Sequence, residues 1–429
     1  MMGRKKGVAQ ARVGDALRCV TPDCAIGTLR QVKLGGWTDR FCTLRLKIKR
    51  RCVLGGFMID VVVSGTGVFT PPLSISNQEL VDSFNAYVAL FNAEHAQDIA
   101  KGNVAAKAPS SVDFIFKSSG IERRYVMEKS GILDPTRMGP RFEPRDDDTP
   151  SMMAEIALDA AQKALDQAGL EASDIDLVIC AASNHERAYP AIAVEIQTLL
   201  GAGGFAFDMN VACSSATFGI QAATDMIKGG SATRALIVSP EITSGHLEWR
   251  DRDCHFIFGD VATAVVVEAA DVARAPKFKI LSTRCATQFS NNIRNNSGFL
   301  RRAHDQLGDH RDMLFMQNGR KVFKEVLPLV SAHIADHLNA SDVQDTDLKR
   351  LWLHQANKTM NDYIGKKVLG RVPEPEEQPN ILQDYANTSS AGSIIAFSKH
   401  SDGLAAGDVG LICSFGAGYS VGSVLLERH

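Results

Sequence analysis

One pattern occurs twice in this chain of 429 residues, and it restricts the possible folds more than any other feature. The first copy is an amphipathic segment at residues 151–170, SMMAEIALDAAQKALDQAGL, which leads through an acidic turn into the apolar run LVIC. The second copy begins about 170 residues later, where KVFKEVLPLVSAHIADHL leads through NASDVQDTD into LKRLWL. In both copies the apolar residues recur at helical spacing, and the short apolar run that follows is typical of a buried strand.

The repeat predicts an α/β fold in which two similar halves, each with helices packed on a sheet, share one core. Duplication explains the length without a second, unrelated domain, and 45% hydrophobic residues are enough to bury such a core. Catalytic groups are expected where the two halves meet.

Residues 1–57 differ from the rest of the chain because they are strongly basic, with 13 Lys and Arg against 3 Asp and Glu. They hold four cysteines, but the wide spacing of the second pair makes a zinc interpretation of CVTPDC weak. We interpret this segment as a disordered basic extension or as upstream sequence outside the native protein, with Met58 as the natural start.

The remaining residues carry 34 Lys and Arg against 46 Asp and Glu, a balance that argues against nonspecific binding to nucleic acid. Their longest apolar runs span about ten residues, which is too short to cross a bilayer. The nine scattered cysteines are typical of reduced thiols. With no signal-peptide pattern after the first basic residues, we expect a soluble cytoplasmic protein that does not associate with membranes.

Cys213 is the first candidate for chemistry. It lies in FAFDMNVACSSATFGIQAATDMI, where a strand-like run gives way to a helix rich in small residues. A thiol at a helix N-terminus faces unpaired amides and the positive end of the helix dipole, and both favour the reactive thiolate. The alternative is a buried structural cysteine, which is our interpretation of Cys180, Cys285 and Cys413.

Two polar candidates follow in the second half. His354 comes at the polar end of LKRLWL, and histidine is the usual acid or base at neutral pH, although a lone histidine is more often structural. Asn387 ends a polar loop in DYANTSSAGSIIAF and opens a small-residue helix, where a helix cap is the simpler explanation.

The C-terminal segment LICSFGAGYSVGSVLL is predicted to be a strand, a glycine turn and a second strand. Too few residues follow for the helix and acidic strand end of a dinucleotide-binding loop. The segment is better interpreted as a turn whose backbone amides face a site and stabilise an oxyanion.

Five segments occur in the order and spacing of β-ketoacyl-acyl carrier protein synthase III: VACSSATFG, FGDVATAVVV, LHQAN, NTSSAGS and SFGAGYSVGSV. From about Met58 to the C-terminus the chain resembles this family of condensing enzymes of the thiolase superfamily, and five ordered motifs are far more specific than one. The resemblance implies a five-layered αβαβα core, usually in a homodimer, with halves at residues 58–270 and 271–429.

The resemblance also implies a catalytic triad of Cys213, His354 and Asn387, and an oxyanion hole formed by the amides of Cys213 and Ala417. The implied substrates are an acyl-CoA primer and malonyl-acyl carrier protein, which are joined by decarboxylative Claisen condensation in fatty acid biosynthesis without a metal or redox cofactor. Asn387 favours a priming enzyme, since elongating relatives resemble a Cys-His-His pattern. Phe415 stands where degradative thiolases carry a second catalytic cysteine, which makes a thiolase less favoured.

Coenzyme A is expected to be held differently from the family pattern. The tryptophan and arginine that family members place around the adenine match Phe114 and Ser118 here, so Lys117 or Arg123 is expected to contribute charge.

Carrier-protein docking is predicted for a lysine-rich helix, although a solvated helix face explains the same residues. These lysines are Lys358, Lys366 and Lys367. Tyr189 matches an aromatic position that gates the acyl pocket across the family dimer, and Phe415 is the second gate candidate. The segment FNAYVALFNAEHAQDIAKGNVAAKAP is longer than typical, and together these features suggest a primer longer than acetyl, such as a medium chain.

Two alternatives to condensation stay open at the level of sequence. An acyltransferase or hydrolase on the same fold would move the Cys213 acyl group to oxygen, nitrogen or water without releasing carbon dioxide. A noncatalytic acyl-binding or scaffold protein would leave three aligned polar residues without a role.

Overall fold

The computed structural model describes residues 59–146, 148–296 and 310–429. The chain divides into two units, Met1–Gly56 and Phe57–His429, and the described residues all belong to the second. The predicted basic extension at residues 1–57 and its cysteines fall outside the described residues. In the part of the chain that is described, every helix is too short or too polar to cross a membrane.

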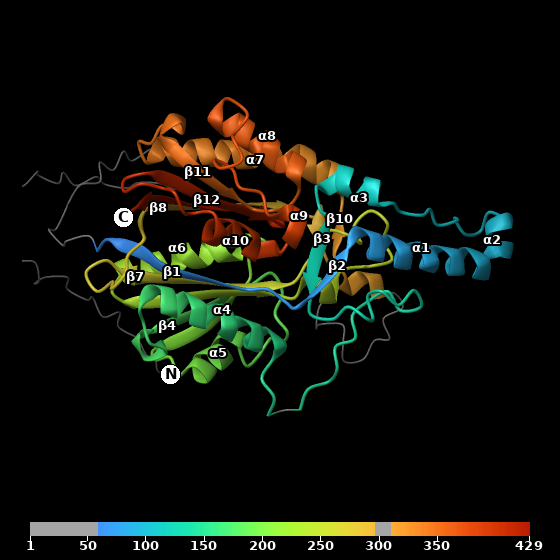
Figure 1. The fold of residues 1–429 in the computed structure, drawn as a ribbon, viewed down its shortest axis with the longest axis horizontal. Helices are drawn as coiled ribbons and strands as arrows, with labels where there is room; N and C mark the ends of the chain where they lie inside the picture. The colour runs from blue at the N-terminus through green and yellow to red at the C-terminus, as the bar shows by residue number, and fades with distance from the viewer. Residues whose placement is uncertain (1–58, 147, 297–309) are drawn as a thin grey trace, which may run out of the picture. The chain divides into compact units, whose positions relative to one another are not determined.

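Among the described residues, nine strands form one hydrogen-bonded sheet that divides into two leaves (Figure 1). The leaves are joined by only two residue pairs, Val62 with Lys279 and Val63 with Phe278. The first leaf contains, in spatial order, β5 (Phe205–Met209), β4 (Leu177–Ala181), β6 (Arg234–Glu241), β7 (Val261–Ala269) and β1 (Val61–Phe69). The second leaf contains β8 (Phe278–Ser290), β13 (Gly418–Arg428), β12 (Val409–Gly416) and β11 (Leu348–Leu353).

Helices cover both leaves and fill the space between them (Figure 1). The inner layer holds α6 (Ser215–Lys228) and α10 (Gly392–Lys399). The outer layers are α4 (Met152–Ala168) with α5 (Ile192–Leu200) on one side and α7 (Gly319–Ala340) with α8 (Lys358–Leu369) on the other. Helix, sheet, helix, sheet and helix therefore succeed one another, which confirms the predicted five-layered αβαβα fold.

The two copies of the sequence pattern fold alike. Helix α4 leads through the 3-10 turn Ala172–Asp174 into β4, and α7 leads through the turn Asp345–Asp347 into β11. Both turns carry a reciprocal capping box, which explains why the acidic residues recur. The predicted boundary at residue 270 falls in the connection between β7 and β8 and stays a prediction.

Close packing of α4 on the first leaf depends on two glycines in β1. A Cβ atom at Gly65 would lie 2.0 Å from the Ala164 carbonyl oxygen, and one at Gly67 would lie 1.9 Å from that of Ala160. Any larger residue would push the helix off the sheet, because protein interiors leave no space for a displaced helix turn. The face of α4 that carries Ala160 and Ala164 is therefore the face that contacts β1.

The remaining elements belong to residues 70–151, an excursion of the chain between β1 and α4, and to short pieces around the second leaf. Helices α1 (Asn77–Glu94) and α2 (Ala96–Ala100) extend away from the sheets (Figure 1). Ser76 begins α1 with a capping box to Glu79. The other elements are α3 (Val112–Ser119), β2 (Leu73–Ser76), β3 (Arg123–Val126), β9 (Ile293–Arg294), β10 (Met316–Gln317) and α9 (Leu382–Tyr385).

Candidate active site

Cys213 lies in the turn between β5 and α6, as the sequence predicts. The turn is held locally by Asn210, whose Oδ1 accepts from the Ala212 amide at 3.0 Å, and by Ser215, whose Oγ accepts from the Val211 amide at 2.8 Å. Ala212 has a φ of 49°, a left-handed conformation that is rare for a residue with a side chain. This tight connection places Cys213 at the start of the inner helix α6.

The Cys213 thiol is enclosed by protein although part of the residue stays accessible. Burial raises its pKa to about 11, because a thiolate is poorly solvated there. Three hydrogen bonds lower this pKa: one from the hydroxyl of Ser389, at 3.3 Å from Sγ, and two from the backbone amides of Cys213 and Ala417. The thiol is therefore protonated at neutral pH, with three donors positioned to stabilise negative charge.

The turn between β12 and β13 meets Cys213 directly. A Cβ atom at Gly416 would lie 2.6 Å from the Cys213 Cβ and 3.0 Å from its sulfur, so only glycine permits this approach. The approach brings the Ala417 amide within hydrogen-bonding reach of the sulfur. Two converging amides, those of Cys213 and Ala417, are the arrangement that stabilises an oxyanion in acyl transfer.

His354 lies just after β11 with its side chain buried. Its amide donates to the Cys413 carbonyl at 2.7 Å, which extends the pairing of β11 with β12 by one residue. The Phe415 ring meets the imidazole edge to face, with centroids 5.1 Å apart. Burial lowers the pKa of His354 to about 3, so its ring is neutral at neutral pH and offers one N–H donor and one acceptor nitrogen.

Asn387 is fixed by both its backbone and its side chain. Its amide donates to the Ile257 carbonyl at 2.9 Å, and its carbonyl accepts from the Gly259 amide at 3.1 Å. Its Oδ1 accepts from the Ser389 amide at 2.8 Å. With Oδ1 engaged in this way, the side chain presents its Nδ2 donors. This contact is the one that a capping Asn makes at the start of the 3-10 helix Ser389–Ala391, and it holds the side chain in one orientation.

Two residues in this site were missed by the sequence analysis. Ser389 joins Asn387 and Cys213, with its amide on one and its hydroxyl on the other. Glu241, at the end of β6, accepts hydrogen bonds from the amide and hydroxyl of both Ser183 and Ser390, and burial raises its pKa to about 7. Ser389 stood in a quoted motif, but no local signal indicated a contact with a thiol 176 residues away.

The predicted CoA-binding residues lie on α3 and β3, and two of them already have partners. Lys117 pairs with Asp113 at 3.0 Å on an exposed face of α3, and Arg123 pairs with Asp384 at 2.5 Å. The ring of Phe114 instead meets a cation that the sequence analysis missed. The Arg252 guanidinium carbon lies 4.0 Å from the centre of this ring.

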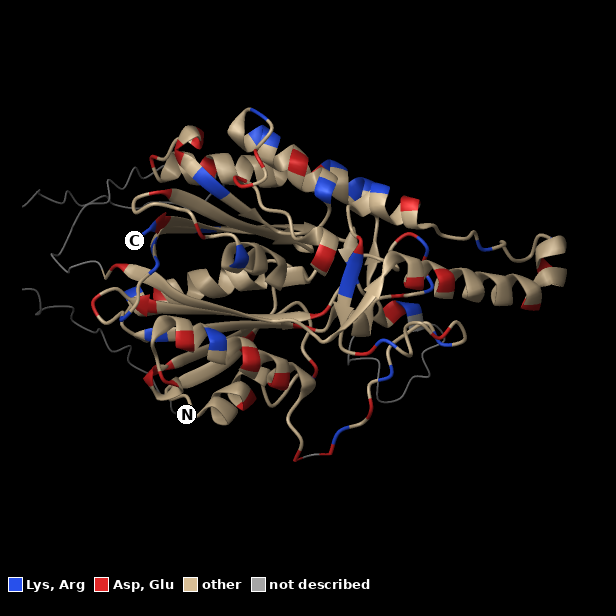
Figure 2. Cartoon of the chain, viewed as in Figure 1, with Lys and Arg blue, Asp and Glu red and all other residues tan. Residues whose placement is uncertain are grey.

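The three lysines predicted to dock a carrier protein share one helix. Lys358, Lys366 and Lys367 are all exposed on α8, and Figure 2 shows further basic residues on the neighbouring α7. Lys358 pairs with Asp362 at 2.7 Å, whereas the ion pairs found among the described residues include neither Lys366 nor Lys367. The docking prediction therefore rests mainly on Lys366 and Lys367.

The two predicted gate residues have different surroundings. Phe415 is buried against His354, while Tyr189 lies on the connection between β4 and α5 with 85% of its surface exposed. A cavity of about 910 Å³ opens beside this connection, and its apolar lining includes Met153, Ile242 and Leu314. Ile242 directly follows Glu241, so the cavity begins next to the candidate site.

A group of possible metal ligands lies at the paired strands β4 and β5. Ligand atoms of Cys180, His185 and Asp208 are within 4.8 Å of one another. Both carboxylate oxygens of Asp208 already accept from the amides of Ile192 and Ala193, which begin α5. A helix cap explains the group, and we assign it no metal.

Comparison with known proteins matches the chain to one family. The 3-oxoacyl-[acyl-carrier-protein] synthase III family matches residues 207–288, and its C-terminal part matches residues 338–428. A β-ketodecanoyl-[acyl-carrier-protein] synthase of Pseudomonas aeruginosa is 57% identical over 350 residues, which cover 81% of this chain and 100% of that protein. A β-ketoacyl-[acyl-carrier-protein] synthase III of Chelativorans is 32% identical over 73% of this chain and 95% of that protein.

Solved structures share the fold at low sequence identity. The priming β-ketosynthase of the R1128 polyketide pathway superimposes with a TM-score of 0.68 at 24% identity, over 86% of this chain and 96% of that one. The 3-oxoacyl-[acyl-carrier-protein] synthase III of Aquifex aeolicus gives 0.67 at 24% identity, over 86% and 99% of the two chains. At this identity the likeness shows the fold alone.

Proposed function

Because the chain belongs to the 3-oxoacyl-[acyl-carrier-protein] synthase III family, it is an acyl-transferring condensing enzyme of fatty acid biosynthesis, and we propose the following roles for its residues. Cys213 accepts the acyl group of an acyl-CoA primer. His354 and Asn387 then activate malonyl-acyl carrier protein for decarboxylative condensation. The contact that carries this assignment is the hydrogen bond from Ser389 to the Cys213 sulfur, made by the residue that also orients Asn387.

In the first half-reaction the Cys213 thiolate attacks the primer carbonyl. A carbon–sulfur bond forms to Cys213, the bond to CoA breaks, and the CoA thiolate leaves and takes up a proton equivalent to the one that the Cys213 thiol released. The tetrahedral oxyanion receives hydrogen bonds from the amides of Cys213 and Ala417, which already converge on the sulfur. The acyl group then occupies the thioester on Cys213.

In the second half-reaction the malonyl thioester carbonyl accepts hydrogen bonds from a neutral His354 and from Asn387 Nδ2. The bond between the malonyl carbon and its carboxylate breaks, and carbon dioxide leaves. The electron pair of this bond forms an enolate, which both donors stabilise. The enolate carbon attacks the acyl carbon on Cys213, and the Cys213 thiolate leaves. Neither half-reaction requires a metal or a redox cofactor.

The primer is proposed to be a medium-chain acyl-CoA with eight carbons. The Pseudomonas relative is named for a β-ketodecanoyl product, which has ten carbons, and malonyl condensation adds two of these. The adenine of CoA is proposed to lie against Phe114 and Arg252 rather than Lys117 or Arg123, which have partners already.

A homodimer is proposed because β5 ends the sheet with one edge unpaired among the described strands. Apolar residues near this edge are exposed, including Phe205 at 41% and Tyr189 at 85%. Pairing of β5 with a second copy would cover them and would bring Tyr189 to the partner's acyl cavity. The described cysteines are all free thiols, which supports the proposed cytoplasmic location.

The decisive experiment measures the intact mass of the protein after incubation with acyl-CoAs of different chain length. We expect an adduct with octanoyl-CoA that disappears with carbon dioxide release when malonyl-acyl carrier protein is added. Cys213→Ala should abolish the adduct. Cys285→Ala should leave it unchanged; this thiol is partly accessible and not buried as the sequence analysis expected, so it is a fair control. His354→Ala and Asn387→Ala should keep acylation and stop carbon dioxide release.

Other outcomes separate the alternatives. An adduct that clears without carbon dioxide would identify an acyltransferase or hydrolase. Acylation of Cys213→Ala would refute the assigned nucleophile, and absence of any adduct would refute the use of an acyl-CoA primer.

A further inference from the structure

A basic hollow lies beside helix α1, and it shares one residue, Arg252, with the proposed adenine site. Its volume is about 430 Å³. Aromatic side chains of α1 form part of its wall, and the cationic side chains come from three separate segments. Its lining residues include Tyr87, Lys107, Glu248, Arg250, Asp251 and Arg252.

Lys107 lies on the segment after α2 and is held against helix α1 by Asn92. Its backbone amide donates to Asn92 Oδ1 at 2.9 Å, and its carbonyl accepts from Asn92 Nδ2 at 3.0 Å. Its Nζ lies 4.7 Å from the centre of the Phe91 ring and 5.5 Å from that of Tyr87. The ion pairs among the described residues do not include Lys107, so aromatic faces rather than a carboxylate hold its charge.

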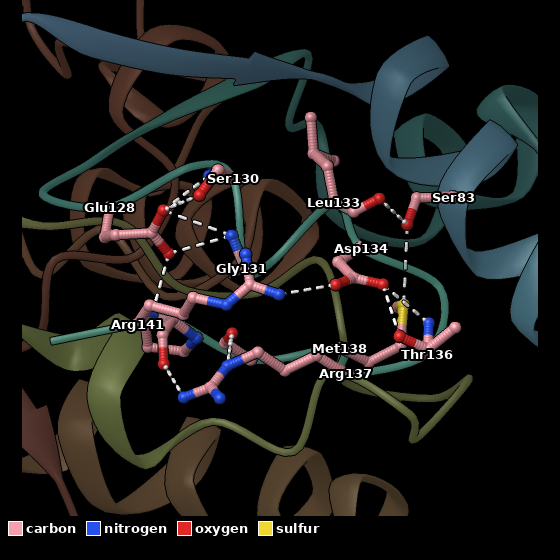
Figure 3. Close-up of polar contacts among 12 residues, drawn as sticks. Ser83, Glu128, Ser130, Gly131, Leu133, Asp134, Thr136, Arg137, Met138 and Arg141 are labelled. Atoms are coloured by element: carbon pink, nitrogen blue, oxygen red, sulfur yellow. Dashed lines mark hydrogen bonds and ion pairs between the residues drawn. The ribbon is translucent and has the colours of Figure 1, made fainter.

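Arg250 is oriented by a neighbouring loop. Its Nη2 donates to the Arg137 carbonyl at 2.7 Å, and its guanidinium carbon lies 5.8 Å from the centre of the Tyr87 ring. Figure 3 shows the loop that contains Arg137, where Glu128 accepts from the amides of Gly131 and Arg141. These contacts order the loop, and the loop in turn fixes the position of Arg250.

Arg252 connects the hollow to the proposed adenine site. Its Nε donates to the Pro109 carbonyl at 2.7 Å, while its guanidinium lies on the Phe114 ring. Helix α3, which carries Phe114, is tied at its end to the loop after His354, because Asn357 Nδ2 donates to the Ser118 carbonyl at 2.6 Å. Arg252 and α3 therefore connect the hollow with the loop that follows His354.

The two carboxylates of the hollow, Glu248 and Asp251, offset only part of its positive charge, because four cations line it: Lys107, Arg250, Arg252 and Arg311. Asp251 pairs with Arg311 at 2.6 Å, and Glu248 accepts from the backbone amide of Arg250 at 2.9 Å. In the described part of the chain, neither carboxylate forms an ion pair with Lys107, Arg250 or Arg252. Two guanidinium groups and an ammonium around one hollow are suited to a phosphate dianion.

We propose that this hollow binds the 3′-phosphate of coenzyme A through Lys107 and Arg250, an inference that rests on the proposed use of an acyl-CoA primer. The phosphate sits on the ribose next to the adenine, and Arg252 belongs both to the adenine site and to the hollow. The segment that follows α2 thus supplies a cation for the nucleotide, in addition to the adenine contacts of Phe114 and Arg252. Acyl groups on carrier protein lack this phosphate, so the hollow selects CoA thioesters as primers.

The test compares octanoyl-CoA with octanoyl-3′-dephospho-CoA in wild-type protein and in the variants Lys107→Gln and Arg250→Gln. We expect each variant to raise the KM for octanoyl-CoA about tenfold, the effect of losing roughly one charged contact. The KM for the dephospho thioester, kcat and the KM for malonyl-acyl carrier protein should not change. Lys101→Gln is the matched control, because it removes the same charge from the exposed tip of the same excursion.

Calorimetric binding of adenosine 3′,5′-bisphosphate tests the hollow without catalysis. Wild-type protein should bind it, and Lys107→Gln should bind it about tenfold more weakly. Equal KM values for the two thioesters in the wild type, equal losses for both in the variants, or absence of bisphosphate binding would overturn the proposal. Bisphosphate binding that weakens in Lys107→Gln without acylation by any acyl-CoA would support the hollow and refute the proposed function instead.

Discussion

Replacement of Ser389 by alanine removes one atom from the candidate site. The hydroxyl oxygen donates to the Cys213 sulfur at 3.3 Å, and the Ser389 residue is buried. The backbone amide of Ser389, which orients Asn387, is kept in the variant. The left-handed backbone at φ 50° is equally accessible to serine and alanine, since both carry a Cβ atom. Ser389→Ala therefore isolates the hydrogen bond to sulfur from the rest of the site.

The size of the effect follows from the charge on the acceptor. A hydrogen bond to a charged group contributes about 1.5–3 kcal/mol, and one pKa unit corresponds to 1.36 kcal/mol, so the pKa of Cys213 should rise by about 1–2 units. The thiolate fraction below the pKa falls about tenfold per unit. A more basic thiolate is a better nucleophile, with a Brønsted slope of about 0.4–0.5, which offsets part of this loss. We expect acylation at pH 7 to slow by about 3–10-fold.

The assay is alkylation of Cys213 by iodoacetamide across a pH series, followed by intact mass. The rate follows the thiolate, so its midpoint reports the pKa of Cys213 in the folded protein. The acylation rate with octanoyl-CoA is measured on the same samples. Carbon dioxide release from malonyl-acyl carrier protein, measured separately, should stay near the wild-type rate because His354 and Asn387 keep their positions.

Ser393→Ala is the matched control for this prediction. Its hydroxyl is also buried, but it contacts Ser414 at 2.7 Å and not the thiol. A pH profile of Ser389→Ala that coincides with the wild type would refute the role of the hydroxyl. An equal shift in Ser393→Ala would show that the effect comes from general loosening of the core.

Three further predictions concern the surroundings of the site. Burial raises the pKa of Glu241 from 4.5 to about 7, so between these pH values the folded protein holds a proton that the unfolded chain releases. The free energy of unfolding should therefore fall by about 3 kcal/mol as the pH rises from 4.5 to 7. Urea unfolding measures this fall, which should be smaller in Glu241→Gln. A Gly416→Ala methyl group would meet Cys213 at 2.6 Å and should slow acylation about 100-fold, the cost of roughly 1 Å of misplacement, whereas an unchanged rate would contradict the close approach. The double change of Lys366 and Lys367 to Glu should raise the KM for malonyl-acyl carrier protein without affecting octanoyl-CoA acylation; equal KM values would leave these lysines as a solvated face.

Much of the fold was predictable because its signals are local. The 3.6-residue spacing in residues 151–170 and the Asp-rich turn after it are properties of neighbouring residues, and both became α4 and its 3-10 turn. The five-layered arrangement came from resemblance to a family rather than from spacing. Contacts such as the two residue pairs that join the leaves involve strands more than 200 residues apart, and no local pattern encodes them.

The candidate site divides in the same way. Cys213, His354 and Asn387 were candidates because each stands near a change from strand or loop to helix, and the family resemblance combined them into a triad whose catalytic roles stay a prediction. Arg252 was missed, because its importance depends on a ring in α3 that lies far away in the sequence. Lys117 and Arg123 were selected for their charge, and only the structure shows that Asp113 and Asp384 already hold them.

The sequence by itself determined which segments form helices and strands and which side chains are candidates for the chemistry, since periodicity, caps and residue type are local properties. Tertiary structure decided how reactive those side chains are. The pKa of Cys213 depends on burial, on the hydroxyl of Ser389 and on the amide of Ala417, and these groups reach the sulfur only when both halves of the chain close on α6. Hydrogen bonds and desolvation act over a few ångströms in space, whatever the distance along the chain.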